Sequence, residues 1–331
     1  MRVFVEIACL ASFLGSLAFG CSSEASSEDT DYIVGALLPF TGALSQANVG
    51  IENGAALALE DVNSAGGVNG RLFRFEKADS RTTPAGAVKG ADFLLKKNIS
   101  VILGAVSSSA TIAAFEKTRP MGTLLVSPAS QADSLTAQDN NGLFLRISPT
   151  TSAQAEVLAK RIFADGYERV GIVSSTQAYA ASWADSLTRE FTSLQCDSGP
   201  CSSVRVDYDE NEDFGSYDFA ADIRNILAKE PDALFFSGLT TDGLGQVDAA
   251  LRAGYEGLLY MGLAVAGGDI ALVLSPEAVK RIRFPAVSSD TEKAGDYWER
   301  RYTSAHGELS AADALARQSF DATMRGCPAP C

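Results

Sequence analysis

Apolar residues recur along the chain in two alternating patterns. Short, mostly apolar runs are typical of buried parallel strands, and longer segments with apolar residues every three or four positions are typical of amphipathic helices. We expect strands at 32–38, 72–78, 101–106, 124–127, 144–147, 169–174, 204–208, 233–237, 258–261 and 281–287. We expect helices at 50–63, 84–97, 110–117, 153–165, 182–194, 217–229, 241–253, 291–306 and 311–324.

This alternation of strand and helix predicts the fold class. Strands that alternate with helices form parallel, doubly wound α/β sheets. The pattern runs twice along a chain of 331 residues, a length that suits about two domains. We therefore expect two open-sheet lobes, with ligands bound by the loops at the carboxyl ends of the strands.

A serine cluster stands where one predicted strand meets the next helix. Ser107, Ser108 and Ser109 follow the run 101–106, and an alanine-rich helical segment begins at Ala110. Free backbone N–H groups and hydroxyls at a helix start favour a carboxylate or another anion. The alternative is that one serine merely caps the helix.

Composition excludes some functions. The chain has 41 Asp and Glu against 27 Lys and Arg, a net charge of −14, which argues against a nucleic-acid partner. The single histidine, His306, removes most histidine-based catalysis and histidine-rich metal sites.

The amino terminus predicts export. Residues 7–19 form an apolar run that is too short to span a bilayer, and small residues precede Cys21. The segment resembles a bacterial lipoprotein signal, so we expect residues 1–20 to be a signal peptide and Cys21 to carry the lipid. Secretion with Cys21 unmodified is the alternative. Residues 21–31 are polar and predict a flexible tether to the membrane.

The remaining cysteines stand in two close pairs. Cys196 and Cys201 bracket a turn sequence, and Cys327 and Cys331 bracket Pro-Ala-Pro at the chain end. Outside the cytoplasm we expect two local disulfides. Four cysteines allow three pairings, and the short separations favour the local one. A four-cysteine zinc site fits less well, because the spacings are not those of zinc knuckles.

Several segments, taken in order, resemble the type I periplasmic ligand-binding proteins, and most closely the leucine/isoleucine/valine-binding receptors of ABC transporters. The resemblance covers about residues 32–324. The matching segments are Gly35–Gly42, Gly54–Arg71, Leu103–Ser108, Ser127–Ser130, Phe144–Pro149, Asp213–Phe214 and Glu230–Gly238.

This resemblance implies a binding mode. The family binds a small solute between two lobes joined by a hinge, here residues 32–147 with 288–331 as lobe 1 and 148–287 as lobe 2. It places Ser107 and Ser130 on the ligand carboxylate, with backbone N–H groups near Ser108 and Ala129. It places the ring of Tyr179 over the ligand, although Tyr179 is equally suited to packing a loop.

The sequence departs from the family at the other end of the ligand. Amino-acid binders have an acidic residue after the strand matched by 258–261, where this chain has Gly262-Leu263-Ala264. The first loop offers Gln46 instead of an aromatic residue, and Leu239 stands after the strand 233–237, where aromatic residues are common. An α-amino acid is therefore in doubt, and an amide or a short carboxylic acid remains open.

We expect a lipid-anchored, extracytoplasmic receptor that delivers a small amino-acid-like or carboxylate ligand to an ABC permease. The alternative is a lipoprotein of the same fold that senses a ligand or binds a partner without transport. No nucleophile and base set for an enzyme is visible, and we expect no cofactor. The acidic stretch 207–218 resembles a calcium loop but has Glu212 where glycine is required, so we expect no metal.

Overall fold

The computed structural model describes residues 31–138, 141–209, 217–262, 264, 274–285, 292–308 and 315–327. These residues all belong to the compact unit Asp31–Cys331. The predicted signal peptide and Cys21 lie outside the described residues, as do the tether up to residue 30, Leu263, Cys331 and residues 210–216 of the acidic stretch.

The first half of the chain forms a five-stranded parallel sheet in the order β2-β1-β3-β4-β5. Its strands are β1 (Tyr32–Leu38), β2 (Phe73–Asp79), β3 (Val101–Gly104), β4 (Leu124–Ser127) and β5 (Phe144–Arg146). The helices between them are α1 (Ser45–Ser64), α2 (Pro84–Lys96), α3 (Ser108–Thr118), the 3₁₀ turn η1 (Arg119–Met121) and α4 (Ser134–Ala137).

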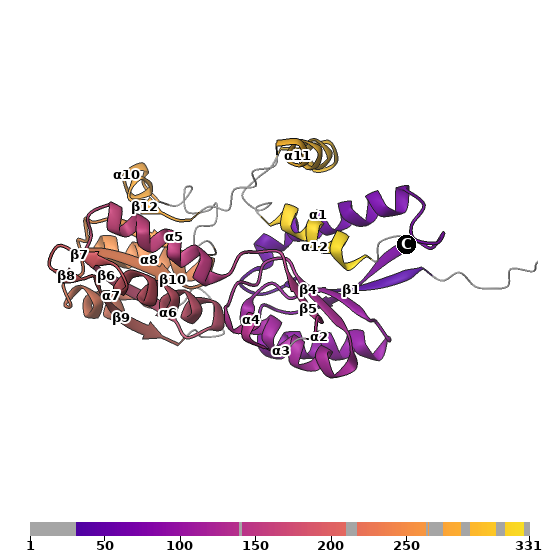
Figure 1. Ribbon diagram of the computed structural model, residues 1–331, viewed down its shortest axis with the longest axis horizontal. Helices are drawn as coiled ribbons and strands as arrows, with labels where there is room; N and C mark the ends of the chain where they lie inside the picture. The colour runs from indigo at the N-terminus through magenta and orange to yellow at the C-terminus, as the bar shows by residue number, and fades with distance from the viewer. Residues whose placement is uncertain are drawn as a thin grey trace, which may run out of the picture. The chain divides into compact units, whose positions relative to one another are not determined.

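Both faces of this sheet are covered, as its apolar strands predict. α2 and α3 cover one face, and α1 covers the other together with α12 (Ala316–Gly326) from the chain end (Figure 1). α1 and α12 pack closely, because a Cβ on Gly54 would lie 1.9 Å from the carbonyl oxygen of Ala316. A glycine is therefore required at position 54 for α12 to lie on lobe 1.

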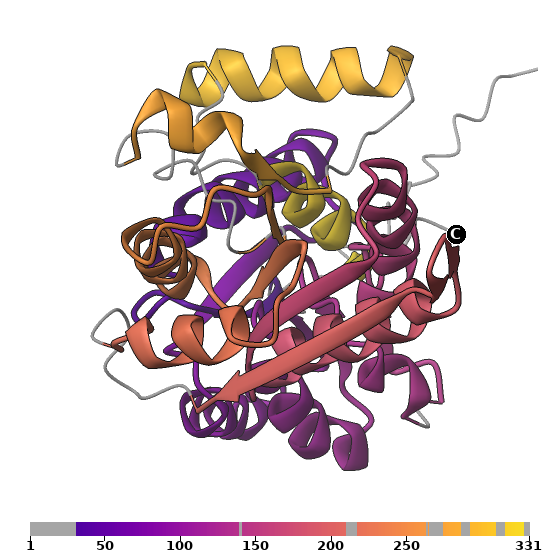
Figure 2. The same cartoon turned by 90° about the vertical axis from the view of Figure 1, so that its left-hand side faces the viewer.

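The second half forms another five-stranded parallel sheet in the order β12-β11-β10-β6-β9. Its strands are β6 (Arg169–Ser175), β9 (Ser202–Tyr208), β10 (Ala233–Ser237), β11 (Leu259–Met261) and β12 (Ile282–Arg283), with β6 and β9 side by side in Figure 2. Its helices are α5 (Thr151–Ala164), α6 (Ala178–Thr192), α7 (Ala220–Leu227), α8 (Thr240–Arg252) and α10 (Pro276–Lys280).

Alternate residues of these strands face opposite layers of helices. Ile172 and Phe235 pack with α5 and α6, whereas Val173 and Phe236 pack with α7 and α8. The period of two along each strand thus fills both cores, so the doubly wound fold predicted from the sequence is confirmed.

After β12 the chain returns to lobe 1 through α11 (Glu292–His306) and α12. Trp298 and Tyr302 of α11 pack against Leu57 of α1. Arg301 donates to carboxylates of Glu60 and Asp61 on α1, at 2.8 and 3.0 Å. Both carboxyl-terminal helices therefore contact the first lobe.

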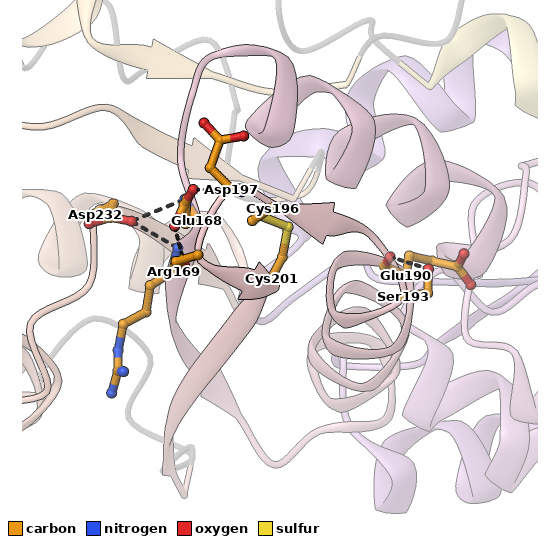
Figure 3. The surroundings of a disulfide bond; sticks show 9 residues. Glu168, Arg169, Glu190, Ser193, Cys196, Asp197, Cys201 and Asp232 are labelled. Atoms are coloured by element: carbon orange, nitrogen blue, oxygen red, sulfur yellow. Dashed lines mark hydrogen bonds between the residues drawn. A yellow bond between two sulfur atoms is a disulfide. The ribbon is translucent and has the colours of Figure 1, made fainter.

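One of the two predicted disulfides is confirmed. Cys196 and Cys201 are bonded, with their Cα atoms 5.1 Å apart, beside the hairpin of β7 (Gln195–Cys196) and β8 (Gly199–Pro200) (Figure 3). The carboxylate of Glu168 accepts a hydrogen bond of 3.0 Å from the backbone N–H of Asp197. The backbone N–H groups of Glu168 and Arg169 in turn donate to Asp232 at 3.0 and 2.9 Å.

The second predicted disulfide is contradicted at Cys327, the residue of the pair that the structure describes. Cys327 is a free thiol that packs against the apolar cluster of Val34, Leu59 and Phe73. Burial raises the pKa of its thiol to about 11, which keeps it protonated and unreactive. Its predicted partner, Cys331, lies outside the described residues.

Several predicted boundaries also need correction. α1 begins at Ser45, so Gln46 lies on a helix and not in a loop, because the hydroxyl of Thr82 accepts from the N–H of Leu44 and fixes the start of the helix. β3 ends at Gly104, and β12 covers only Ile282–Arg283, since its ladder with β11 ends there.

Candidate functional site

The site predicted from the serine cluster lies at the carboxyl end of β3. Ser107 is the N-cap of α3, and its hydroxyl accepts from the N–H of Ala110 at 3.3 Å and donates to the carbonyl of Thr82 at 3.2 Å. Its side chain is buried. Both hydrogen bonds of this hydroxyl are therefore made inside lobe 1, as the capping alternative requires.

Ser108 links α3 to the segment that follows β4. Its buried hydroxyl oxygen accepts from the backbone N–H groups of Gln131 and Ala132, each at 3.2 Å. The hydroxyl thus fixes the position of residues 131–132 beside the start of the helix.

Ser130 belongs to a buried hydroxyl network within lobe 1. Its hydroxyl lies 2.6 Å from that of Thr111 and 2.8 Å from that of Ser127, and it donates to the carbonyl of Val106 at 3.1 Å. Ala129 is half-buried next to it. The structure therefore brings the predicted residues that follow β3 and β4 together, with the serine hydroxyls bonded to protein groups.

Ser109, the third serine of the predicted cluster, points toward the second lobe. It is half-exposed, and its hydroxyl oxygen accepts from the backbone N–H of Ala178 at 3.1 Å. Ala178 is the first residue of α6, so the amino termini of α3 and α6 meet at this bond. The sequence could not distinguish Ser109 from the other two serines of the cluster, because its partner belongs to the other lobe.

The two facing helix ends favour a negative charge. The first backbone N–H groups of a helix have no partner within the helix, and the helix dipole adds about half a positive charge there. Neither α3 nor α6 has an acidic residue in its first turn, in a chain with a net charge of −14. This junction of α3 and α6 is our candidate anion site.

Tyr179 lies one residue beyond the junction, in the core of the second lobe. Its ring is buried beside Trp183, and its hydroxyl accepts from the backbone N–H of Ala264 at 3.2 Å. Burial raises the pKa of this hydroxyl to about 12, so it stays neutral. The ring holds the segment after β11, and its predicted place over a ligand stays a prediction.

Gly262 at the end of β11 leaves room for that tyrosine. A Cβ at this position would lie 2.9 Å from the hydroxyl oxygen of Tyr179 and 3.4 Å from Nε1 of Trp183. The space that an acidic side chain would need is therefore occupied by aromatic groups.

The two remaining predicted residues differ in their surroundings. Gln46 is exposed on α1. Leu239 precedes α8 of the second lobe and is buried in a cluster with Leu38 and Leu44 of the first. Leu239 is thus a contact between the lobes.

Asp242 is a buried acid near this contact that the sequence did not indicate. Its carboxylate accepts from the hydroxyl of Tyr208 at 3.0 Å and from the N–H of Leu239 at 3.3 Å. Burial raises the pKa of the carboxyl, and the two hydrogen bonds lower it less. The start of α8 therefore already holds an acid, unlike those of α3 and α6.

The described residues hold neither a cluster of metal-binding side chains nor a helix long and apolar enough to cross a membrane. The three aspartates described in the calcium-like stretch have other partners, and Asp218 accepts from the backbone N–H of Ala220 at 3.0 Å. Asp207 pairs with Arg205 at 2.6 Å, and Asp209 accepts from the hydroxyl of Thr176 at 2.9 Å.

Two parallel α/β lobes whose helix amino termini face each other define the class of bilobal solute-binding proteins. The chain belongs to the periplasmic binding protein family, whose model matches residues 32–325. Members of this family are periplasmic or extracytoplasmic solute-binding proteins, and the chain is accordingly a binding protein and not an enzyme.

The chain is also similar to individual proteins of this family. The Leu/Ile/Val-binding protein BraC3 of Rhizobium johnstonii is 26% identical over 314 residues, which are 94% of this chain and 78% of the relative. The chemotactic signal transduction system substrate-binding protein BasB of Halobacterium salinarum is 28% identical over 315 residues, covering 90% of this chain and 71% of the relative.

Among solved structures, the fold is similar to that of an ABC-transporter solute-binding protein from R. palustris in complex with benzoate. The TM-score is 0.71 and the identity 19%, over 88% of this chain and 78% of the other. Together with the family match, this supports the bilobal fold.

Proposed function

We propose that the chain is the solute-binding protein of an ABC importer and binds a small carboxylate between its two lobes. The observation that carries the proposal is the bond between Ser109 and Ala178, at which the amino termini of α3 and α6 meet. A ligand that contacts both helix ends stabilises the arrangement in which they face each other, because only there can it bind both.

The carboxylate is held chiefly by backbone groups in this proposal. The hydroxyls of Ser107 and Ser130 are bonded within lobe 1, so the N–H groups of residues 108 and 109 are the donors left for the ligand on α3. A charge near a helix terminus gains about 0.3–1 kcal/mol, and up to about 2 kcal/mol when partly buried. Two facing helices double this preference for an anion.

The ligand we propose lacks an ammonium group. An ammonium needs an acidic partner, and at the end of β11 the position of Gly262 is occupied by Tyr179 and Trp183. Asp242 is buried and bonded to Tyr208 and to the N–H of Leu239. Among known relatives, the R. palustris protein is in complex with benzoate, an acid of this kind, whereas BraC3 is named for amino acids.

The other predicted residues have supporting places in this proposal. Ser107, Ser108, Ala129 and Ser130 shape the floor of the subsite in lobe 1, where their side chains or backbone lie beside the start of α3. Tyr179, Gln46 and Leu239 border the rest of the ligand, with Leu239 on the apolar side.

A thermal-shift screen with matched ligands tests the proposal. We expect benzoate and isocaproate to raise the melting temperature, by several degrees when present at about a hundred times their Kd. Benzamide and isocaproamide, which lack the charge, should raise it little, and leucine, which is isocaproate with an added ammonium, less than isocaproate. Equal shifts by amides and acids would contradict the anion site, and a larger shift by leucine would identify an amino-acid binder.

We also propose that the protein is anchored through Cys21, because small residues precede this cysteine after an apolar run. A Cys21→Ser variant should no longer be found in the detergent phase or in the membrane fraction. Retention of the variant in the membrane fraction would contradict the lipid anchor.

Sensing is the second candidate function, and the likeness to the chemotactic substrate-binding protein of H. salinarum favours it. Deleting the gene separates the two candidates. Loss of uptake of the radiolabelled carboxylate indicates transport, whereas loss of the response to it with normal uptake indicates sensing.

A further inference from the structure

The carboxylate of Asp133 in lobe 1 accepts hydrogen bonds from hydroxyl groups of lobe 2. Asp133 immediately precedes α4, and its two oxygens accept from the hydroxyls of Thr151 at 3.0 Å, Ser152 at 2.8 Å, Ser182 at 3.3 Å and Ser186 at 2.9 Å. The N–H of Asp133 donates back to the hydroxyl of Ser182 at 3.0 Å. The partners come from both α5 and α6.

The carboxylate is bound there as an anion. Burial raises the pKa of Asp133, but the hydrogen bonds from Ser152, Ser186 and Thr151 outweigh it and leave the pKa below its ordinary value. The guanidinium of Arg146 is a nearby positive charge, and it donates to the carbonyl of Ala132 at 2.9 Å. Hydrogen bonds to a charged acceptor are about twice as strong as neutral ones.

The groups around the carboxylate are attached to two different hydrophobic cores. α5 and α6 share the core of the second sheet, and the hydroxyls of Thr151 and Ser182 lie 2.5 Å apart, so the four hydroxyls move together. Leu135 on α4 is buried in the core of the first sheet, so Asp133 moves with lobe 1. The short side chains cannot follow a large rotation of one lobe against the other.

The same segment reaches the candidate anion site. Ser108 accepts from the N–H groups of Gln131 and Ala132, and the side-chain oxygen of Gln131 accepts from Nε2 of Gln154 on α5 at 2.9 Å. The carbonyl of Gln131 also accepts from the N–H of Thr151 at 2.9 Å. Residues 131–133 thus connect the start of α3 directly to lobe 2.

We infer that Asp133 is a positioning residue that stabilises the arrangement of the two lobes in which α3 and α6 face each other. Its carboxylate does so by accepting hydrogen bonds from the hydroxyls of Thr151, Ser152, Ser182 and Ser186. It acts through lobe geometry and does not touch the ligand. The effect on ligand affinity rests on the proposed function, whereas the effect on lobe geometry does not.

The test measures lobe geometry in the full-length protein without added ligand. Spin labels are attached to keto amino acids introduced at the exposed positions 96 and 229, one in each lobe. This chemistry does not use cysteine, so the native cysteines stay in place. We expect Asp133→Ala and the double variant Ser182→Ala/Ser186→Ala to shift and broaden the distribution of distances between the two labels by several ångströms. Asp133→Asn keeps one acceptor oxygen and should restore part of the wild-type distribution.

The matched control is Thr192→Ala. This removes a hydroxyl from the far end of α6, where its bonds to described residues go to the backbone carbonyls of Thr188 and Arg189. The control should leave the distribution unchanged. An unchanged distribution in a folded Asp133→Ala, or in the double serine variant if Asp133→Ala fails to fold, would overturn the inference.

Ligand titration separates this inference from the proposed function. With a carboxylate that binds the wild type, we expect Asp133→Ala to weaken binding about tenfold, since it loses charge-assisted hydrogen bonds that form in the locked arrangement. If no carboxylate binds the wild type, the proposed function fails while the distance measurement still decides the role of Asp133.

Discussion

Serine residues that look alike in the sequence have different partners in the structure. Ser107, Ser108 and Ser130 are bonded within lobe 1, whereas Ser109 accepts from an N–H of lobe 2. The run of serines after β3 predicts an anion site at the start of α3, and that site stays a prediction. It cannot tell which serine faces the ligand, because that depends on residues far away in the chain.

The hydroxyl of Ser130 should matter more for folding than for binding. We expect Ser130→Ala to lower the free energy of unfolding by about 1–3 kcal/mol, because the buried hydroxyls of Thr111 and Ser127 each lose a partner. Urea denaturation measures this loss. Unchanged stability together with a large loss of carboxylate affinity would instead place the Ser130 hydroxyl on the ligand.

The buried carboxyl of Asp242 should make stability depend on pH. Because burial raises its pKa above the ordinary 3.8, the folded protein holds this proton more tightly than the unfolded chain does. This contribution to stability therefore falls as the pH rises from 3.8 through the raised pKa. We expect Asp242→Asn, which keeps the shape but does not titrate, to gain stability over the wild type as the pH rises from about 3 to about 7. A gain that is the same at both pH values would contradict the raised pKa.

At the scale of elements, the apolar pattern predicted most strands and helices closely. β1 has the predicted bounds, and α2 ends one residue earlier than predicted. Such elements carry local signals, namely a continuous apolar run in β1 and a threonine cap followed by proline in α2.

Elements that depend on a partner were not predictable from their own residues. β12 is shorter than its apolar run because β11 offers only a short ladder, and the hairpin of β7 and β8 contains too few apolar residues for a strand signal. The local Cys196–Cys201 bond was predictable because its cysteines flank a turn. The free Cys327 was not, since its burial depends on where α12 packs.

The Cys196–Cys201 disulfide should stabilise the second lobe without affecting the ligand site. Closing so short a loop is worth about 2 kcal/mol in the chain-entropy model. We expect Cys196→Ser/Cys201→Ser to lower the free energy of unfolding by about this amount and to leave carboxylate affinity unchanged. Equal stability of the reduced and oxidised wild-type protein would contradict the structural role.

For the whole molecule, the sequence predicted two doubly wound lobes and left their contacts unknown. The alternation of strands and helices implies the fold class, but the strand orders and the returning helices α11 and α12 arise from packing between distant segments. The bonds from Ser109 to Ala178 and from Asp133 to α5 and α6, and the burial of Leu239, all join residues of different lobes. No local pattern reports such contacts.

These contacts give the central claim that a carboxylate is held between the amino termini of α3 and α6. The most direct test is calorimetric titration of benzoate and isocaproate into the wild type, Ser109→Asp and Ser109→Asn. Aspartate at the start of α3 keeps the helix stable and puts a negative charge in the anion site, whereas asparagine has the same shape without the charge. We predict that Ser109→Asp binds about a hundredfold more weakly than Ser109→Asn, since two like charges in close contact repel by several kcal/mol at a partly buried site. Equal affinities of the two variants would contradict the account.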